Sequence, residues 1–139
     1  MKRVFFTDRD LGKQFPAILA AAGLSVERHA DLFPADGSDE QWLEHCGRHA
    51  RIAITHNHRI RYVPNELAAV RKFGVRLLVV IGRAPTAELA RNFVSTLGRI
   101  EAVLAELPAP AIVKVYRAAP GELKTQPHAP GRVEVWLRG

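Results

Sequence analysis

The sequence predicts an α/β domain with a mostly parallel central sheet, and three observations support that prediction. Short apolar segments alternate along the chain with longer segments whose apolar residues recur at helical spacing, which is the pattern of strand–helix–strand units. Two short segments, residues 52–54 and 77–81, are continuously apolar, as expected for strands covered on both faces. The length of 139 residues suits one domain with a substantial core.

The first part of the chain is predicted to form, in order, a strand, a helix, a second strand, a loop and a second helix. Gly23 is the expected end of the first helix, because glycine adopts the left-handed conformation that closes many helices. Ser38 is the expected N-cap of the second helix, and Gln41 completes a capping-box pattern. The expected bounds of the five segments are residues 3–7, 10–22, 24–29, 31–37 and 39–49.

The middle of the chain holds the most apolar segments. Pro64 suits the first turn of a helix that runs to Phe73, and Gly74 is expected to end it. A longer helix over residues 86–106 carries its apolar residues on one face. The other segments are two strands and a polar loop between them, expected at residues 51–55, 75–81 and 56–62.

The last part of the chain is predicted to contain two strands. Residues 111–117 alternate as a strand, and residues 132–137 alternate again and are expected to pair with it. Residues 118–131, rich in proline and glycine, are predicted to be a loop. We therefore divide the chain into a domain over residues 1–117 and a C-terminal loop and strand extension over residues 118–139.

The composition has an excess of positive charge. Twenty lysines and arginines against 14 aspartates and glutamates give a net charge of +6. A basic surface suits RNA or an acidic protein partner, and charge that only maintains solubility is an equally good interpretation.

The cysteine content and the apolar runs predict a cytoplasmic protein. Cys46 is the only cysteine, which excludes an internal disulfide and favours a reducing compartment. The N-terminal apolar run stops at Asp8, so it is a poor signal peptide. No apolar run is long enough to span a bilayer, and we expect no membrane partner.

Polar residues follow three of the predicted strands. Asp8 follows the first strand, Asn57 the third and Arg83 the fourth. Parallel strands end at one edge of a sheet, and ligands bind there, where the strand order switches. We therefore expect Asp8, Asn57 and the helix start at Asp39-Glu40 to surround one cleft.

Clustered carboxylates in such a cleft point to a divalent metal ion. Like charges within a few ångströms repel one another, and a cation offsets the repulsion. Mg²⁺ or Mn²⁺ takes hard oxygen ligands and assists displacement at a phosphodiester. Basic residues would hold the nucleic acid backbone, and those placed for this role are Arg9, Lys13, Arg59, Arg61 and Arg83.

Each candidate also has a purely structural interpretation. Asp39 and Glu40 fall in the first turn of a helix, where the helix dipole favours acids. Asp8 suits the N-cap of the following helix, and Asn57 suits a turn.

The histidines raise the alternative of a zinc site. His45 and His49 are one helical turn apart, and His56 and His58 follow in the loop. The chain has no paired-cysteine spacing and no His-Glu-x-x-His motif, so surface or hydrogen-bonded histidines are the favoured interpretation.

Four segments can be considered together. They are Phe5-Phe6-Thr7-Asp8-Arg9-Asp10-Leu11, His29-Ala30-Asp31-Leu32-Phe33-Pro34, Ser38-Asp39-Glu40-Gln41-Trp42-Leu43 and Ile54-Thr55-His56-Asn57-His58-Arg59-Ile60. Together they resemble the PIN-like domains associated with VapC-type toxins. Their order and spacing agree with the family. With Val79-Val80-Ile81-Gly82 and the long helix that follows, the resemblance spans about residues 3–117.

The resemblance implies a three-layer α/β/α sandwich and a Mg²⁺- or Mn²⁺-dependent ribonuclease, the toxin of a toxin–antitoxin pair. Its implied partners are RNA and an antitoxin protein that blocks the site, and a homodimer is compatible with the sequence. The implied catalytic residues are Asp8, Asp39 or Glu40, and Asn57. Of these, Asp8 is the first metal-binding acid, and Asp39 or Glu40 is the second. The implied RNA contacts are Arg9, Lys13, Arg59 and Arg61.

Asn57 departs from the family pattern, which has a third acid at this position. An amide keeps the shape but lacks the negative charge, so metal affinity and water activation should fall. Three interpretations stay open: a weakened nuclease, a nuclease that uses a neighbouring acid such as Asp10 or Glu66, and an inactive RNA- or protein-binding module.

A phosphoacceptor receiver domain is a second class to consider. Asp8, Asn57 and Lys114 match its polar positions in outline. The acceptor would then be Asn57, which cannot be phosphorylated as aspartate is, and only an analogy of fold supports this interpretation.

Overall fold

The computed structural model describes residues 3–138, apart from the side chain of Arg61. It contains a six-stranded sheet with the strand order β2-β1-β3-β4-β5-β6, in which the first five strands are parallel and β6 is antiparallel to β5. The strands are β1 (Val4–Thr7), β2 (Ser25–Arg28), β3 (Ile52–Thr55), β4 (Arg76–Ile81), β5 (Ala111–Tyr116) and β6 (Val133–Arg138). The predicted α/β class with a mostly parallel sheet is confirmed.

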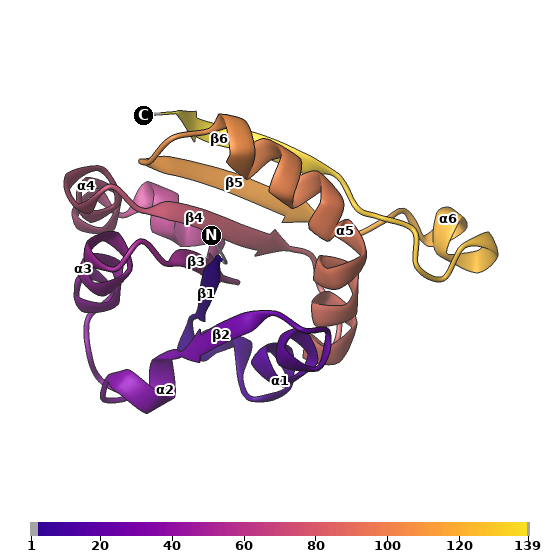
Figure 1. Cartoon of the computed structure of the whole chain (residues 1–139), viewed down its shortest axis with the longest axis horizontal. Helices are drawn as coiled ribbons and strands as arrows, with labels where there is room; N and C mark the ends of the chain where they lie inside the picture. The colour runs from indigo at the N-terminus through magenta and orange to yellow at the C-terminus, as the bar shows by residue number, and fades with distance from the viewer. Residues whose placement is uncertain (1–2, 139) are drawn as a thin grey trace.

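Helices cover both faces of the sheet, which completes a three-layer sandwich (Figure 1). One core cluster joins the sheet to α1 and α5, and the other joins it to α3 and α4. The α-helices are α1 (Gln14–Ala21), α2 (His29–Leu32), α3 (Asp39–Arg48), α4 (Pro64–Phe73), α5 (Thr86–Glu106) and α6 (Pro120–Thr125), and two 3-10 helices are η1 (Arg9–Leu11) and η2 (His58–Tyr62).

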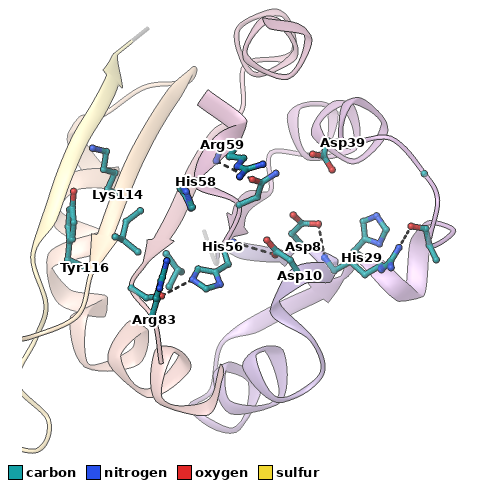
Figure 2. A pocket seen from close by; sticks show the side chains of 17 residues that line it. Asp8, Asp10, His29, Asp39, His56, His58, Arg59, Arg83, Lys114 and Tyr116 are labelled. Carbon is teal, nitrogen blue, oxygen red and sulfur yellow. Dashed lines mark hydrogen bonds between the residues drawn. The ribbon is translucent and has the colours of Figure 1, made fainter. Parts of the chain in front are cut away.

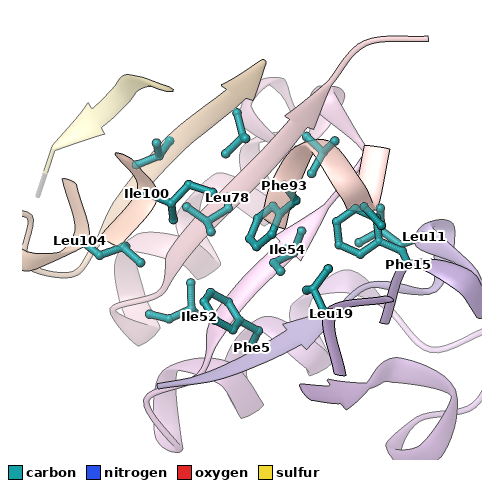
Figure 3. Packing of buried hydrophobic residues seen from close by; sticks show 14 of the residues in the cluster. Phe5, Leu11, Phe15, Leu19, Ile52, Ile54, Leu78, Phe93, Ile100 and Leu104 are labelled. Carbon is teal, nitrogen blue, oxygen red and sulfur yellow. The ribbon is translucent and has the colours of Figure 1, made fainter. Parts of the chain in front are cut away.

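Adjacent phenylalanines on β1 anchor the two cores. Successive side chains of a strand point to opposite faces, so Phe5 contacts Phe93 edge to face at 5.8 Å between ring centroids, whereas Phe6 stacks on Trp42 at 5.6 Å. Phe15 of α1 also meets the Phe93 ring, at 5.7 Å, and Figure 3 shows these rings packed between the sheet and the helices. The end of β1 is therefore held from both sides, which fixes the position of the residues that follow it.

Several local predictions need correction. The helix predicted over residues 10–22 is divided into η1 and α1, because Gly12 has a φ of +68° between them. Part of the loop expected over 31–37 belongs to α2, and most of the polar loop over 56–62 is η2. Ser38 is the N-cap of α3, but its side chain makes no capping hydrogen bond, so the capping box does not form.

The C-terminal region is more regular than its composition suggests. The predicted loop over residues 118–131 contains α6, which begins with Pro120 in its first turn. β6 forms where residues 132–137 predict a strand, and it pairs with β5. In the described part of the chain, no helix combines the length and the apolar character needed to cross a membrane.

Candidate functional site

A cleft of about 880 Å³ lies where the strand order of the sheet reverses. β1 and β3 are neighbours there, although β2 is next in sequence to β1, and such switch points are the usual ligand sites of open parallel sheets. The ends of β1 and β3 contribute Asp8 and Asn57 to this main cleft, and the start of α3 contributes Asp39. These three residues surround one cleft, as the sequence predicts.

Asp8 is held tightly at the end of β1. The residue is only 8% exposed. Oδ1 accepts a hydrogen bond from the backbone nitrogen of Arg9 at 2.7 Å, and Oδ2 accepts one from the Thr55 hydroxyl at 2.8 Å. The first bond makes Asp8 the N-cap of η1. The structural interpretation of Asp8 therefore holds, and the same carboxylate also lines the cleft.

Asp10 brings a second carboxylate to the same place. Its Oδ2 lies 3.4 Å from the Thr55 hydroxyl, and its Oδ1 accepts a hydrogen bond from the backbone nitrogen of His56 at 3.3 Å. The Thr55 hydroxyl is thus within hydrogen-bonding distance of both carboxylates. Because η1 turns the chain back over the end of β3, Asp8 and Asp10 point toward one side chain of that strand.

Burial and mutual repulsion weaken the acids of this cluster. Burial, and then the negative charge of Asp10, raise the pKa of Asp8 from 3.8 to about 7. Burial also raises the pKa of Asp10. Burial, contact with Asp39 and the charge of Asp8 raise the pKa of Glu66 to about 7. The Glu66 Oε2 atom is buried and has no hydrogen-bond partner among the described residues.

Asp39, rather than Glu40, is the acid that α3 presents to the cleft. Asp39 lines the cleft and accepts a hydrogen bond from the indole nitrogen of Trp42 at 2.9 Å. Glu40 is exposed and is absent from the cleft lining. Of these two neighbours, the structure therefore places only Asp39 at the cleft.

Asn57 lines the cleft and also shapes its own turn. Its Oδ1 accepts a hydrogen bond from the backbone nitrogen of Arg59 at 3.1 Å, which caps η2. Its backbone nitrogen donates to the Thr55 hydroxyl at 3.1 Å. The amide oxygen at the expected third acidic position is therefore engaged by the local backbone.

The far side of the cleft is basic. Figure 2 shows Asp8, Asp10 and Asp39 at one end, and Arg83, Lys114 and Tyr116 toward the other. We call these the acid end and the basic end, and the basic end also includes Arg59, which lines the cleft together with His58. Lys114 belongs to β5, and its ammonium group lies 3.4 Å from the carboxylate of Glu134 on β6.

The predicted RNA contacts are only partly brought together. Arg9 and Arg59 line the cleft, and the guanidinium of Arg9 donates to the backbone oxygen of Ala35. Lys13 lies outside the main cleft, beside a smaller neighbouring cavity, because Gly12 turns the chain away after η1. The Arg61 side chain lies outside the described part of the structure.

Two residues that the sequence names only in alternative roles, His56 as a possible zinc ligand and Glu66 as a neighbouring acid, lie in or near the cleft. His56 lines it, and its Nε2 atom lies 2.9 Å from the backbone oxygen of Gly82, which ties the end of β3 to the end of β4. Glu66 approaches Asp39 only through the packing of α4 against α3. The position of His56 beside Asn57 signals its place in the cleft, whereas the contact of Glu66 with Asp39 depends on tertiary packing.

The histidines proposed as an alternative zinc set are divided between two places. His45 pairs through Nε2 with the Glu27 carboxylate at 3.0 Å, which also binds Arg51 at 3.1 Å, and the ring of His49 packs 4.7 Å from that of His45. His56 and His58 lie in the cleft instead.

The donor set of the acid end fits a hard divalent cation, but it is not a closed cage. Within residues 3–138, no group of three histidine, cysteine or acidic side chains is close enough to hold a metal ion. Mg²⁺ commonly binds through one or two carboxylates, with waters and substrate phosphates as its other ligands. The carboxylates of Asp8 and Asp10 lie within hydrogen-bonding distance of the Thr55 hydroxyl, and both have raised pKa values. This pair matches that kind of open site.

Comparison with known protein families gives a match over the first part of the chain. A family model described as a PIN like domain matches residues 3–82, which is more than half of the chain. No curated protein matches the chain, and no solved structure matches it. The matched residues include the ends of β1, β3 and β4, and therefore the acid end of the cleft.

Proposed function

This chain belongs to the PIN-like domain family, which has a nuclease-type fold, and we propose that it is a Mg²⁺- or Mn²⁺-dependent ribonuclease weakened at one position. The observation that carries the proposal is the convergence of Asp8 and Asp10 on the Thr55 hydroxyl at the switch point of the sheet. Two neighbouring carboxylates that repel each other, of which Asp8 is buried and Asp10 is exposed, are what a bound cation would stabilise.

Asp8 and Asp10 would hold the metal ion, and Asp39 faces the same space. A bound divalent ion would supply Lewis-acid stabilisation of the phosphoryl oxygens and a more acidic bound water. The Thr55 hydroxyl and the backbone nitrogens of Arg9 and His56 orient the two carboxylates. These contacts fix both acids before any cation arrives, which is the preorganisation that a metal site needs.

The basic end would bind the polyanion. Arg59, Arg83 and Lys114 provide positive charge along the cleft wall, and Tyr116 provides an aromatic surface. Cations neutralise phosphates, and aromatic rings accept stacked bases of single-stranded RNA. We infer that a single-stranded RNA lies across the cleft with a phosphate at the acid end.

Asn57 is the reason for proposing a weakened enzyme. Its amide oxygen already accepts the Arg59 backbone hydrogen bond, and a neutral amide attracts a hard cation less than a carboxylate does. A chain that has kept RNA or protein binding and lost catalysis is the second candidate, and the same amide favours it. The remaining expectations, an antitoxin partner and a toxin role of the VapC type, belong to the proposal through the resemblance alone.

The test compares cleavage of a single-stranded RNA by three chains: the native one, Asp8→Asn and Asp31→Asn. Asp31 lies exposed on α2, outside the cleft lining, and serves as the matched control for the loss of one carboxylate. We expect native cleavage in Mg²⁺ or Mn²⁺ that stops with a chelator. Asp8→Asn should lose at least about a hundredfold, because a metal ligand is removed, and Asp31→Asn should match the native chain.

The outcomes separate the candidates. RNA binding without cleavage by any chain in either metal would favour the binding module. Cleavage that is indifferent to Asp8→Asn would place the active site elsewhere and refute the proposal.

A further inference from the structure

A second cavity, of about 560 Å³, lies beside the main cleft and has no role in the function proposed above. It is formed between the first half of α5 and the segment that contains α6, and Figure 1 shows α6 standing outside the sheet beside α5. Its polar lining includes Arg91, Asn92, Ser95, Arg117, Lys124 and His128.

Hydrogen bonds to α5 fasten the segment that forms the outer wall of this cavity. The Asn92 side chain donates to the backbone oxygen of Tyr116 at 3.0 Å and accepts from the backbone nitrogen of Ala118 at 3.1 Å. The buried hydroxyl of Thr96 accepts from the backbone nitrogen of Gly131 at 2.9 Å. A Cβ atom at Gly131 would lie 1.7 Å from the Tyr116 oxygen, so only glycine permits this approach. Both ends of the wall are thus anchored.

The charge of the second cavity is predominantly positive. Arg91, Arg117 and Lys124 are basic side chains, whereas Glu88 is the one carboxylate in the lining, and it pairs with Arg117 at 3.4 Å. The side chains of Arg91 and Lys124 are exposed. Apolar residues, among them Leu123, complete the lining. Cations beside apolar surface suit a ligand that has both phosphates and flat bases.

The second cavity and the main cleft share a thin wall. Gly82 lines the main cleft, and a Cβ atom at this position would lie 3.0 Å from Cδ of Arg117, which lines the second cavity. Tyr116 and Arg117 are consecutive, and each lines one of the two spaces. A chain that leaves the basic end of the cleft past Gly82 therefore meets Arg117 next.

We propose that the second cavity binds the continuation of the same single-stranded RNA, beyond the nucleotides held in the main cleft. This inference rests on the proposed function, because it takes RNA as the occupant of the main cleft. Arg91 and Lys124 contact phosphates of the outlying nucleotides, and the apolar wall near Leu123 receives a base or a ribose. The chain then binds long RNA more tightly than RNA that fills the main cleft alone.

The test measures dissociation constants of two labelled RNAs, of about 4 and about 12 nucleotides, by fluorescence anisotropy. The Asp8→Asn chain is used in Mg²⁺ to prevent cleavage. The variant is Arg91→Gln with Lys124→Gln. Its matched control is Arg71→Gln with Lys72→Gln, which removes the same charges from the exposed end of α4, at the opposite edge of the sheet.

We expect the Arg91→Gln, Lys124→Gln variant to weaken binding of the long RNA about tenfold. The magnitude of the negative slope of log affinity against log salt should fall by about 1.4, because two phosphate contacts are lost. Binding of the short RNA should change less than about twofold. The Arg71→Gln, Lys72→Gln control should leave both affinities near those of the parent chain.

Three outcomes would overturn the inference. Equal losses in variant and control would mean that only overall charge matters. If the Arg91→Gln, Lys124→Gln variant binds the long RNA normally while Arg59→Gln weakens the binding of both RNAs, the main cleft binds RNA and the second cavity does not. If the parent chain binds neither RNA, the proposed function fails together with this inference.

Discussion

The two ends of the main cleft belong to one edge of one sheet, yet they are built in opposite ways. At the acid end, Asp8 is buried and both of its oxygens accept hydrogen bonds from neighbouring groups. At the basic end, Arg59 and Arg83 are exposed. The acid end sits where the strand order switches, between β1 and β3, and the basic end extends from η2 across the ends of β4 and β5.

This difference separates two kinds of contribution. Buried charges that are fixed in position act strongly on nearby chemistry and on stability, because solvent screens them little. Exposed cations act mainly on encounter and on the salt dependence of binding. Substitutions at the acid end should therefore change turnover and the free energy of unfolding, and substitutions at the basic end should change RNA affinity.

The largest expected effect is that of Asp10→Asn. Asp10 shares the Thr55 hydroxyl with Asp8, so its loss should lower the cleavage rate about a hundredfold in saturating RNA. RNA affinity should stay the same or rise slightly, because a negative charge is removed. A gel-based cleavage assay with a parallel binding titration measures both, with Asp31→Asn as the control. Cleavage equal to that of the control would remove Asp10 from the acid end.

The next effect is a gain. Asn57→Asp restores a carboxylate beside the acid end, so cleavage should rise about tenfold and half-saturation should need less Mg²⁺ or Mn²⁺. A metal titration of the cleavage rate measures both quantities. If the added charge lowers activity instead, then the native amide is not a weakened metal ligand.

Asp8→Asn should stabilise the fold in the absence of metal. The pKa of Asp8 rises from 3.8 to about 7 on folding, so the folded state binds a proton more tightly than the unfolded state does. Stability from this group is therefore present at low pH and is lost as the pH rises from about 4 to about 7. Removing the charge should gain about 1–2 kcal/mol at a pH of about 8, after the weakened hydrogen bonds are counted, and almost nothing at a pH of about 4.

Urea unfolding in a chelator at several pH values measures this gain, with Asp31→Asn as the control. With added Mg²⁺, the native chain should become more stable than Asp8→Asn, because the cation stabilises only the chain that binds it. If Asp8→Asn lowers the free energy of unfolding at every pH, then charge repulsion at the acid end does not destabilise the native fold.

The smallest effect belongs to the basic end. Arg59→Gln and Arg83→Gln should each weaken RNA binding about threefold to fivefold. Each should also reduce the magnitude of the negative slope of log affinity against log salt by about 0.7, since each removes one phosphate contact. The cleavage rate in saturating RNA should stay close to native. Anisotropy at several salt concentrations, with Arg71→Gln as the control, measures the slope. A large fall in the saturated rate would erase the division between the two ends.

Much of the scaffold follows from local chemistry. The bounds of α5 follow from apolar periodicity, and those of α4 follow from Pro64 at its start and Gly74 at its end, where φ is +67°. The place of Asp8 and Asn57 in one cleft follows from the geometry of parallel strands. These features depend on residues close in sequence or on a general rule of sheets, so a single sequence contains them.

Other features depend on tertiary packing. Asp39 and Glu40 both suit the first turn of α3, and the structure places Asp39 at the cleft, where it accepts a hydrogen bond from Trp42, whose indole stacks on Phe6. Glu66 meets Asp39 through helix packing alone. For α6, Pro120 was a usable start signal, but the prolines and glycines around it favour a loop, and the anchoring by Asn92 is a long-range contact.

The seat of Trp42 gives the acid end an optical reporter. Its indole is fully buried, stacks on Phe6 and donates to the Asp39 carboxylate, whereas the chain's other tryptophan, Trp136, is 36% exposed. An aqueous quencher added to the solution would therefore suppress the emission of Trp136 before that of Trp42. The remaining fluorescence comes from Trp42, whose indole is hydrogen-bonded to the Asp39 carboxylate. Its emission wavelength and lifetime would therefore change when a cation binds that carboxylate, and metal binding could be followed without an attached label.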